Sequence, residues 1–274
     1  MTTNSFQVGN ATFGDGRLTI IAGPCVIESE DHALMMAREC KQRAQAAGLD
    51  FVFKASFDKA NRSSVESFRG LGMEAGLGVL QRVKDELEVP VITDVHDVSQ
   101  IEPVAAVADI LQIPAFLSRQ TDLVLAAAKS GRAVNVKKGQ FLAPGDARNI
   151  VDKARTAGCE KILLTERGVS FGYNNLVVDM RSFAIMKRFA VPIVFDVTHS
   201  LQLPGGLGHA TGGQPEFIEP LARAGVAAGV DAVFMEVHDD PKHALSDGPN
   251  ALPLDRMQSL LNVLRDVHQL LRTS

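Results

Sequence analysis

Short runs of apolar residues recur along the chain, and each is followed by a polar or glycine-rich segment and then by residues with helical spacing. Most of these runs are apolar throughout instead of alternating, which is typical of strands buried on both faces of a parallel sheet. The pattern predicts eight strands: Leu18–Ala22, Phe51–Lys54, Val91–Asp94, Ile110–Ile113, Ala133–Lys137, Lys161–Thr165, Ile193–Val197 and Ala232–Glu236.

Helical periodicity separates these strands and ends the chain. It predicts helices over Glu30–Ala47, Thr121–Lys129, Ala147–Ala157, Met180–Phe189, Pro215–Ala228 and Leu254–Leu271. Eight β/α units in one series, with no linker between halves, predict a single (β/α)8 barrel domain over residues 1–274. Residues 1–17 are expected to form a hairpin that caps the N-terminal end of the barrel. A doubly wound open sheet is the alternative fold.

Composition limits the class of protein. The 274 residues are 46% hydrophobic and 22% charged, as in ordinary globular proteins, and the net charge is −4. An acidic balance argues against a nucleic-acid partner. We find no apolar run long enough to span a membrane and no signal-peptide pattern at the start, so a cytoplasmic location is expected. Three cysteines, Cys25, Cys40 and Cys159, are too few for a disulfide framework.

Positive side chains follow several of the predicted strands at their C-terminal ends, where barrel enzymes carry out their chemistry. They include Lys54, Lys59 and Arg62 after strand two, Lys137 after strand five, and Arg167 after strand six. Gathered cations predict an anion-binding site suited to two phosphates and a carboxylate. The alternative is that each cation only pairs with a nearby acid such as Asp58 or Glu166.

A second group combines a thiol, an imidazole and two carboxylates. Cys25, His199, Glu236 and Asp247 have no short metal-motif spacing, but closure of a barrel makes strands one, seven and eight neighbours. These donors would suit Zn²⁺ or Fe²⁺ better than Mg²⁺. A buried free thiol and a hydrogen-bonded loop histidine are the alternatives for Cys25 and His199.

Residues 203–213 are rich in glycine and follow strand seven. Thr211 occupies the position of the third glycine of a GxGxxG fingerprint, so a nucleotide-binding loop is rejected. The segment is predicted to be a lid over the barrel mouth, and the alternative is a surface loop without function.

Longer motifs carry a resemblance that covers nearly the whole chain. They are residues 21–25 (IAGPC) with 27–29, 53–64 (FKASFDKANRSS), 112–122 (QIPAFLSRQTD), 135–140 (NVKKGQ), 171–176 (FGYNNL) and 195–200 (FDVTHS). Together they closely resemble the 3-deoxy-D-manno-octulosonate 8-phosphate synthases. This family condenses phosphoenolpyruvate with D-arabinose 5-phosphate and water, a step toward lipopolysaccharide.

The resemblance implies which residues bind substrate. Phosphoenolpyruvate would be held by Lys54, Ser56, Gln112, Ala115, Lys137 and Arg167. The pentose phosphate would be held by Lys59, Asn61, Arg62 and Ser63, with Arg119 reaching in from a neighbouring subunit of a homotetramer. Lys54 and Lys59 would orient the carboxylate and the aldehyde. Asp94 and His96 would assist proton transfer or only position their neighbours.

The resemblance also implies a metal. Members of this family carry cysteine at the position of Cys25 when they depend on metal and asparagine when they do not. The ligands then fall on Cys25, His199, Glu236 and Asp247, with one divalent ion of the Zn²⁺, Fe²⁺ or Mn²⁺ class per subunit and no organic cofactor. His199 would be a ligand first and a proton relay second.

Two other functions stay open. A 3-deoxy-D-arabino-heptulosonate 7-phosphate synthase uses erythrose 4-phosphate on a similar barrel, although Asn61, Arg62 and Ser63 argue against it. A barrel that binds sugar phosphates without catalysis would bind ligands and release no phosphate.

Overall fold

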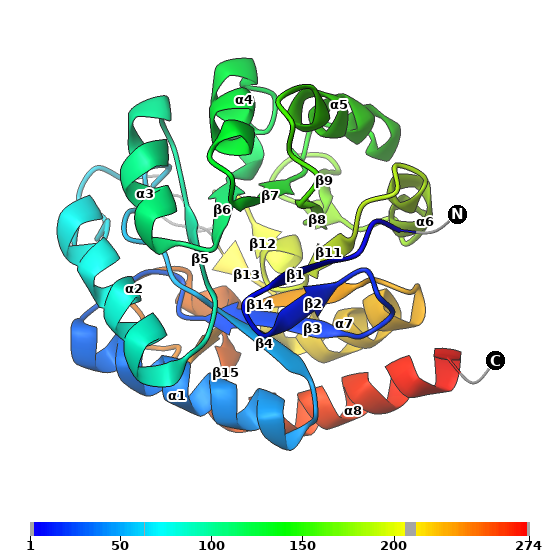
Figure 1. Cartoon of the computed structure of the whole chain (residues 1–274). Coiled ribbons are helices and arrows are strands. Elements are labelled where there is room, and N and C mark those ends of the chain that lie inside the picture. The colour runs from blue at the N-terminus through cyan, green and yellow to red at the C-terminus, as the bar shows by residue number, and fades with distance from the viewer. Residues whose placement is uncertain (1–2, 63, 206–211, 273–274) are drawn as a thin grey trace.

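Eight parallel strands close into a barrel in the computed structural model, which describes residues 3–62, 64–205 and 212–272 (Figure 1). Each strand pairs in parallel with the next, and pairing of β11 with β14 closes the ring, which excludes the open doubly wound sheet. The barrel strands are β3 (Thr19–Gly23), β4 (Asp50–Lys54), β5 (Val91–Asp94), β6 (Ile110–Ile113), β7 (Ala133–Lys137), β8 (Ile162–Glu166), β11 (Ile193–Asp196) and β14 (Ala232–His238).

Helices cover the outside of the barrel. They are α1 (Glu30–Ala46), α2 (Met73–Leu87), α3 (Ile101–Val107), α4 (Thr121–Lys129), α5 (Arg148–Thr156), α6 (Arg181–Lys187), α7 (Ile218–Ala227) and α8 (Leu254–Arg272). Helix α1 begins where the Ser29 side chain accepts a hydrogen bond from the His32 amide, at 3.2 Å. The chain leaves α1 through Gly48, whose φ of +68° suits glycine. None of the described helices combines the length and apolarity needed to cross a bilayer.

An N-terminal hairpin closes the bottom of the barrel, as predicted. Its strands β1 (Phe6–Val8) and β2 (Ala11–Phe13) pair antiparallel. Phe13 is fully buried and belongs to a core inside the barrel, together with side chains such as Val52 and Phe234. A larger core lies between the strands and the helices. The hairpin therefore seals one end and leaves the opposite end, where the strands terminate, open for chemistry.

Smaller elements lie in the loops after the strands. Antiparallel pairs are formed by β9 (Val169–Ser170) with β10 (Leu176–Val177) and by β12 (Gln202–Leu203) with β13 (Gly212–Gly213), and β15 (Leu252–Pro253) pairs in parallel with the end of β14. Short 3-10 helices occupy Val98–Gln100, Ala115–Leu117, Pro144–Ala147, His199–Leu201, Pro215–Phe217 and Gly248–Asn250. The middle of the predicted lid, residues 206–211, lies outside the described residues.

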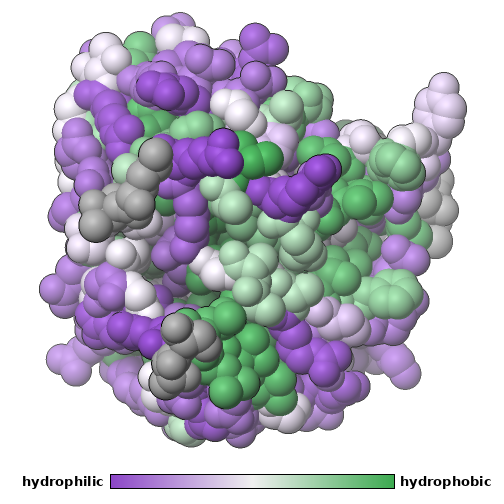
Figure 2. Space-filling view, turned by 90° about the vertical axis from the view of Figure 1, so that its right-hand side faces the viewer, coloured by the Kyte–Doolittle hydropathy of each residue, from purple (hydrophilic) through white to green (hydrophobic). Residues whose placement is uncertain are grey.

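The outer surface is largely hydrophilic on the face shown in Figure 2, with apolar patches between the polar residues. Leu270 and Leu271 near the end of α8 are among the exposed large apolar side chains.

Close packing of α7 on β11 depends on Gly225. A Cβ at this position would lie 2.3 Å from the buried ring of Phe195. We therefore expect Gly225→Ala to lower the free energy of unfolding by about 1–3 kcal/mol through overpacking. Gly78 in α2 is the matched control, because nothing lies within 4 Å of its added Cβ, and Gly78→Ala should raise stability by roughly 0.5–1 kcal/mol. Urea unfolding of both variants checks this, and equal effects at the two sites would contradict the packing argument.

Candidate active site

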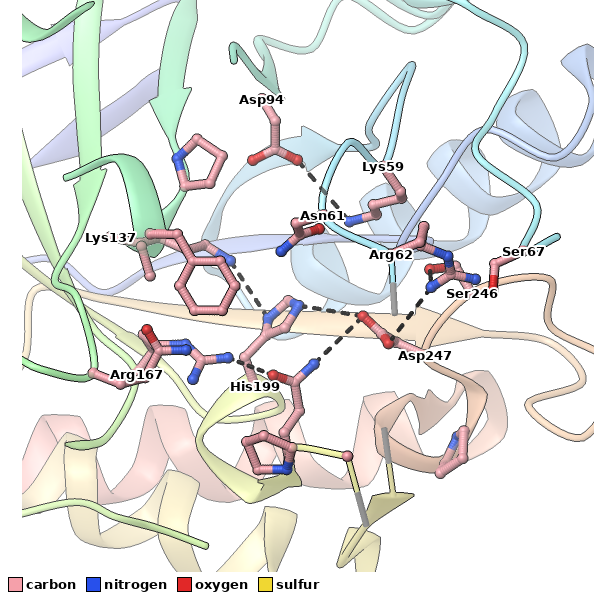
Figure 3. Close-up of a pocket in the computed structure, with 18 of the residues that line it drawn as sticks. Lys59, Asn61, Arg62, Ser67, Asp94, Lys137, Arg167, His199, Ser246 and Asp247 are labelled. Atoms are coloured by element: carbon pink, nitrogen blue, oxygen red, sulfur yellow. Dashed lines mark hydrogen bonds and ion pairs between the residues drawn. The ribbon is translucent and has the colours of Figure 1, made fainter. Parts of the chain in front are cut away.

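A cavity of about 400 Å³ opens at the C-terminal end of the barrel strands. Most of the residues that the sequence placed at strand ends line it, and Figure 3 shows many of them converging from different strands and loops. The predicted residues that line the cavity are Lys59, Asn61, Arg62, Asp94, His96, Ala115, Lys137, Arg167, His199 and Asp247. Barrel closure thus brings together side chains that are far apart in sequence.

The cations stand in two groups on opposite sides of the cavity. Lys137 and Arg167 lie on one side, and Lys59 and Arg62 lie on the other (Figure 3). Each arginine retains a buried guanidinium nitrogen, Nη1 of Arg167 and Nε of Arg62, with no hydrogen-bond partner within the described chain. Buried donors without partners are costly, so these two nitrogens point to anions that complete the site.

The lysines nevertheless have acidic partners. Lys137 Nζ lies 2.6 Å from Asp196 Oδ2, and Lys59 Nζ lies 4.0 Å from Asp94 Oδ2 and 3.8 Å from Glu236 Oε1. Asp58 pairs instead with Arg69, and Glu166 pairs with Lys138. The lysines of the cavity are therefore both gathered together and paired with acids. These acids, Asp196, Asp94 and Glu236, lie on the barrel strands.

A chain of buried side-chain hydrogen bonds runs beneath the cavity from β8 to β5. Thr165 donates to Asn135 Oδ1 at 2.7 Å, and Asn135 Nδ2 donates to Gln112 Oε1 at 2.9 Å. Gln112 Nε2 then donates to Asp94 Oδ1 at 2.6 Å, while the Ser56 hydroxyl donates to the other oxygen of Asp94. Both oxygens of Asp94 are fixed in this way, so its carboxylate is a rigid partner for the lysines above it.

Three residues predicted to bind substrate lie in this floor and not on the cavity wall. Lys54, Ser56 and Gln112 are at most 1% exposed. Lys54 Nζ donates to the Cys25 carbonyl at 3.0 Å and lies 3.3 Å from Glu236 Oε1. In this structure they organise the groups that line the cavity.

Charges close to one another shift the pKa values in the site. Burial alone would raise the pKa of Asp94, but Lys54, Lys59 and Lys137 outweigh it and hold that pKa far below its usual range. Burial would lower the pKa of Lys59, but Cys25, Glu236 and Asp94 raise it well above normal. Burial does lower the pKa of Lys137 in spite of the pair with Asp196. Lys59 is therefore a fixed cation, and Lys137 gives up a proton more readily.

The four predicted metal ligands meet at one side of the cavity. Donor atoms of Cys25, Glu236 and Asp247 all lie within 4.8 Å of one another. His199 Nε2 lies 3.3 Å from Glu236 Oε1 and 3.8 Å from Asp247 Oδ2. Glu236 Oε2 is buried and has no hydrogen-bond partner among the described residues. Cysteine and acidic residues can therefore form a metal site here, and the unpartnered carboxylate oxygen fits a bound cation.

Asp196 orients the histidine of this group, and it is a residue that the sequence did not assign to the site. Its Oδ2 lies 2.7 Å from His199 Nδ1, which turns Nε2 toward the other ligands. Burial raises the pKa of the Cys25 thiol well above its usual range, and the neighbouring carboxylate of Glu236 raises it further. A bound cation would therefore have to displace the thiol proton.

Two predicted residues are not placed at the cavity. Ser63 lies outside the described residues. Arg119 is exposed and is not part of the cavity lining, and its carbonyl accepts a hydrogen bond from Lys153 at 3.2 Å. Gln202 and Ser246, which the sequence did not single out, line the cavity and bond to Arg167 and Arg62 respectively. Gln202 lies three residues after His199 and Ser246 directly precedes Asp247, so closeness in sequence to a predicted ligand is the signal that could have found them.

A model of the DAHP synthetase I family matches residues 3–273. The chain belongs to the DAHP synthetase I family. Among curated relatives, a protein of Trichlorobacter lovleyi is 55% identical over 271 residues, covering 98% of this chain and 100% of the relative. A protein of Cupriavidus taiwanensis is 59% identical over 273 residues, covering 97% of this chain and 93% of the relative. Both relatives carry the name 2-dehydro-3-deoxyphosphooctonate aldolase.

Proposed function

We propose that this chain condenses phosphoenolpyruvate with D-arabinose 5-phosphate and water, giving 3-deoxy-D-manno-octulosonate 8-phosphate and inorganic phosphate. The names of full-length relatives at 55% and 59% identity support this reaction. The observation that carries it is the cavity with two separate cationic sides, each with an unpartnered arginine nitrogen. Two phosphorylated substrates that must meet in one cavity need two such sides.

Each cationic side holds one substrate. Lys137 and Arg167 hold the phosphate of phosphoenolpyruvate, and Lys59 with Arg62 and Asn61 receives the pentose phosphate. Carbon three of phosphoenolpyruvate then attacks the aldehyde carbon while the oxygen of a water molecule adds at carbon two. The proton that this water releases neutralises the alkoxide formed from the aldehyde. The tetrahedral intermediate expels phosphate by breaking its C–O bond. Arg167 and Lys137 stabilise the charge on that leaving group because they are fixed beside it before the reaction begins.

The pKa shifts described above keep Lys59 positively charged and Asp94 negatively charged during the reaction. Lys59, held as a cation, stabilises the oxygen of the aldehyde as it becomes an alkoxide. Asp94 fixes Lys59 and does not itself take up a proton in the neutral range, because its pKa is held so low. His96 lines the cavity beside Asp94 and positions the pentose.

A divalent ion of the Zn²⁺, Fe²⁺ or Mn²⁺ class is proposed at Cys25, His199, Glu236 and Asp247, one per subunit. When bound, it would position a water molecule or a pentose hydroxyl and would not undergo redox chemistry. The donor set of one sulfur, one nitrogen and carboxylate oxygens supports this class of ion.

A homotetramer is also proposed, in which Arg119 reaches the cavity of a neighbouring subunit. Arg119 is exposed and Phe116, which lines the cavity, has 58% of its surface exposed. An exposed aromatic ring and cation next to the cavity mouth suit contact with a second copy of the chain. The cytoplasmic location stays a prediction.

Substrate chain length tests the proposed reaction. Phosphate release from phosphoenolpyruvate should be fast with D-arabinose 5-phosphate and much slower with D-erythrose 4-phosphate, because the cavity is expected to be shaped for the longer sugar. A colorimetric phosphate assay with both sugars at several concentrations measures this. A preference for erythrose 4-phosphate would assign the chain to heptulosonate synthesis instead. Binding of both substrates without phosphate release would indicate a non-catalytic barrel.

A further inference from the structure

A second group of potential metal ligands lies outside the cavity, where the loop after β3 approaches the loop after β14. Glu28, His32 and His238 each offer one donor atom, and these atoms lie within 4.8 Å of one another. His238 and Glu28 are largely buried, with side-chain exposures of 7% and 17%, and the His32 side chain is 15% exposed. None of the three lines the active-site cavity or belongs to the Cys25 group.

Asp239 organises the two imidazoles of this group. Its Oδ1 lies 3.0 Å from His32 Nε2 and 3.2 Å from His238 Nδ1. His32 Nε2 donates its N–H to Asp239 Oδ1, which leaves His32 Nδ1 with a free lone pair. His238 Nδ1 accepts the Asp240 amide at 3.0 Å, so the ring proton of His238 lies on Nε2 and faces Glu28 Oε1. A cation bound at His238 Nε2 would replace this proton, and the proton would move to Nδ1 beside Asp239 Oδ1. Metal-binding histidines in proteins are commonly oriented by a carboxylate in this manner.

Two further observations point to a ligand that is a cation. His32 Nδ1 is buried and has no hydrogen-bond partner in the described part of the chain. His238 Nε2 and Glu28 Oε1 lie 3.2 Å apart. Ligands bound to one tetrahedral ion at about 2.0–2.1 Å lie roughly 3.3 Å from each other, so this separation suits two ligands of the same ion.

We propose that Glu28, His32 and His238 form a second divalent-cation site, distinct from the Cys25 site. Two imidazoles and one carboxylate, with no sulfur, are donors that bind Zn²⁺ well and leave a fourth position to water. The competing description is a histidine–carboxylate hydrogen-bond cluster without an ion, in which His238 Nε2 donates to Glu28 Oε1 at 3.2 Å.

The second site is connected to the loop that carries the catalytic ligand Asp247. Glu28 Oε1 also accepts the Leu245 amide at 2.8 Å, while His238 precedes the same loop. The loop in turn holds Arg62, which donates to the Leu245 carbonyl and the Ser246 hydroxyl, both at 2.9 Å. A cation bound to Glu28 and His238 therefore fixes both ends of residues 239–245. We assign the second site the role of holding this loop in place.

Counting ions tests the proposal without reference to activity. Metal-free protein is loaded with Zn²⁺ by equilibrium dialysis, and bound zinc is measured by elemental analysis. The wild-type chain is expected to bind two ions, His32→Ala one, Cys25→Ala one, and the double variant none. His243→Ala is the matched control, because His243 is an exposed histidine in the same loop that pairs with Asp240, and this variant should still bind two ions.

Cobalt distinguishes the two sites by their chemistry. Co²⁺ at the Cys25 site should show a thiolate-to-metal charge-transfer band, and Co²⁺ at the second site should not. The band should persist in His32→Ala and vanish in Cys25→Ala. Zinc should also slow exchange of the Leu245 amide in wild type more than in His32→Ala.

One zinc ion in wild type and in His32→Ala alike would overturn the proposal and leave a hydrogen-bonded cluster. His32→Gln provides a second variant if the alanine variant does not fold. Because the count is independent of turnover, failure of the second site would not affect the proposed reaction, and failure of the reaction would not affect the count.

Discussion

Removal of the divalent ion is expected to reduce phosphate release by about 100-fold or more, and adding it back should restore turnover. The reason lies in the donors themselves. Without an ion, the Cys25 thiol stays protonated and Glu236 Oε2 stays buried with no hydrogen-bond partner among residues 3–62, 64–205 and 212–272. His199, Glu236 and Asp247 then face one another without the cation that would hold them together, and no ion positions the reacting water or hydroxyl.

The experiment must separate the catalytic ion from the second one. Chelator treatment of wild type removes both ions, whereas His32→Ala is expected to hold only the ion at the Cys25 group. Loss and recovery of phosphate release in His32→Ala would therefore assign the effect to the catalytic site. Circular dichroism before and after chelation shows whether the fold persists. Undiminished turnover in protein with verified absence of metal would refute metal dependence.

Substitution of Cys25 complements chelation. Cys25→Asn is expected to weaken metal binding and to retain part of the turnover, because the family that the motifs resemble has asparagine here in its metal-independent members. Tight stoichiometric metal binding at this site by the variant would remove Cys25 from the ligand set.

The barrel followed from the sequence because each strand is buried on both faces and each turn interrupts an apolar run. Five of the eight strand predictions differ from the structure by one or two residues at one or both ends, and β5, β6 and β7 have the predicted bounds 91–94, 110–113 and 133–137. No residue bounds were predicted for helices α2 and α3. The polar residues around Val98–Gln100 and the glycines at the start of α2 weaken the periodic signal there.

The convergence of Cys25, His199, Glu236 and Asp247 was predictable for a reason of topology. Strand order alone makes β3, β14 and β11 neighbours, so residues after them must share one sector of the mouth. Side-chain contacts across the barrel were not predictable in the same way. The hydrogen-bond chain from Thr165 through Asn135 to Gln112 depends on the register of β8, β7 and β6, which no sequence pattern specifies. The contact of Asp196 with His199 Nδ1 was not predictable for the same reason.

Lys54 was predicted to bind substrate because it ends strand β4, and the structure shows it buried in the floor of the cavity. The sequence alone cannot show that the Lys54 amine reaches the Cys25 carbonyl and Glu236 beneath the cavity. Lys59, five residues later, extends into the cavity itself. Lys137 also ends its strand, β7, yet it lines the cavity, so the position along a strand does not by itself separate a lysine in the floor from one on the cavity wall.

Arg167→Ala is expected to lower kcat/KM for phosphoenolpyruvate by roughly 30- to 3,000-fold, as loss of a buried charge-assisted partner costs about 2–5 kcal/mol and each 1.4 kcal/mol is tenfold. Burial lowers the pKa of this guanidinium, but it remains charged at neutral pH, and its Nη1 is free to hold a phosphate oxygen. Arg167→Lys keeps the positive charge but loses the planar pair of N–H donors of the guanidinium, so its kcat/KM should fall less than that of Arg167→Ala.

Arg69→Ala is the control, because Arg69 pairs with Asp58 and does not line the cavity. Steady-state kinetics in which each substrate is varied in turn locates the effect. KM for phosphoenolpyruvate should rise in Arg167→Ala while KM for the pentose phosphate changes little, since Arg62 on the opposite side is untouched. A rise confined to the pentose phosphate would exchange the two phosphate assignments, so this measurement decides which side of the cavity receives which substrate.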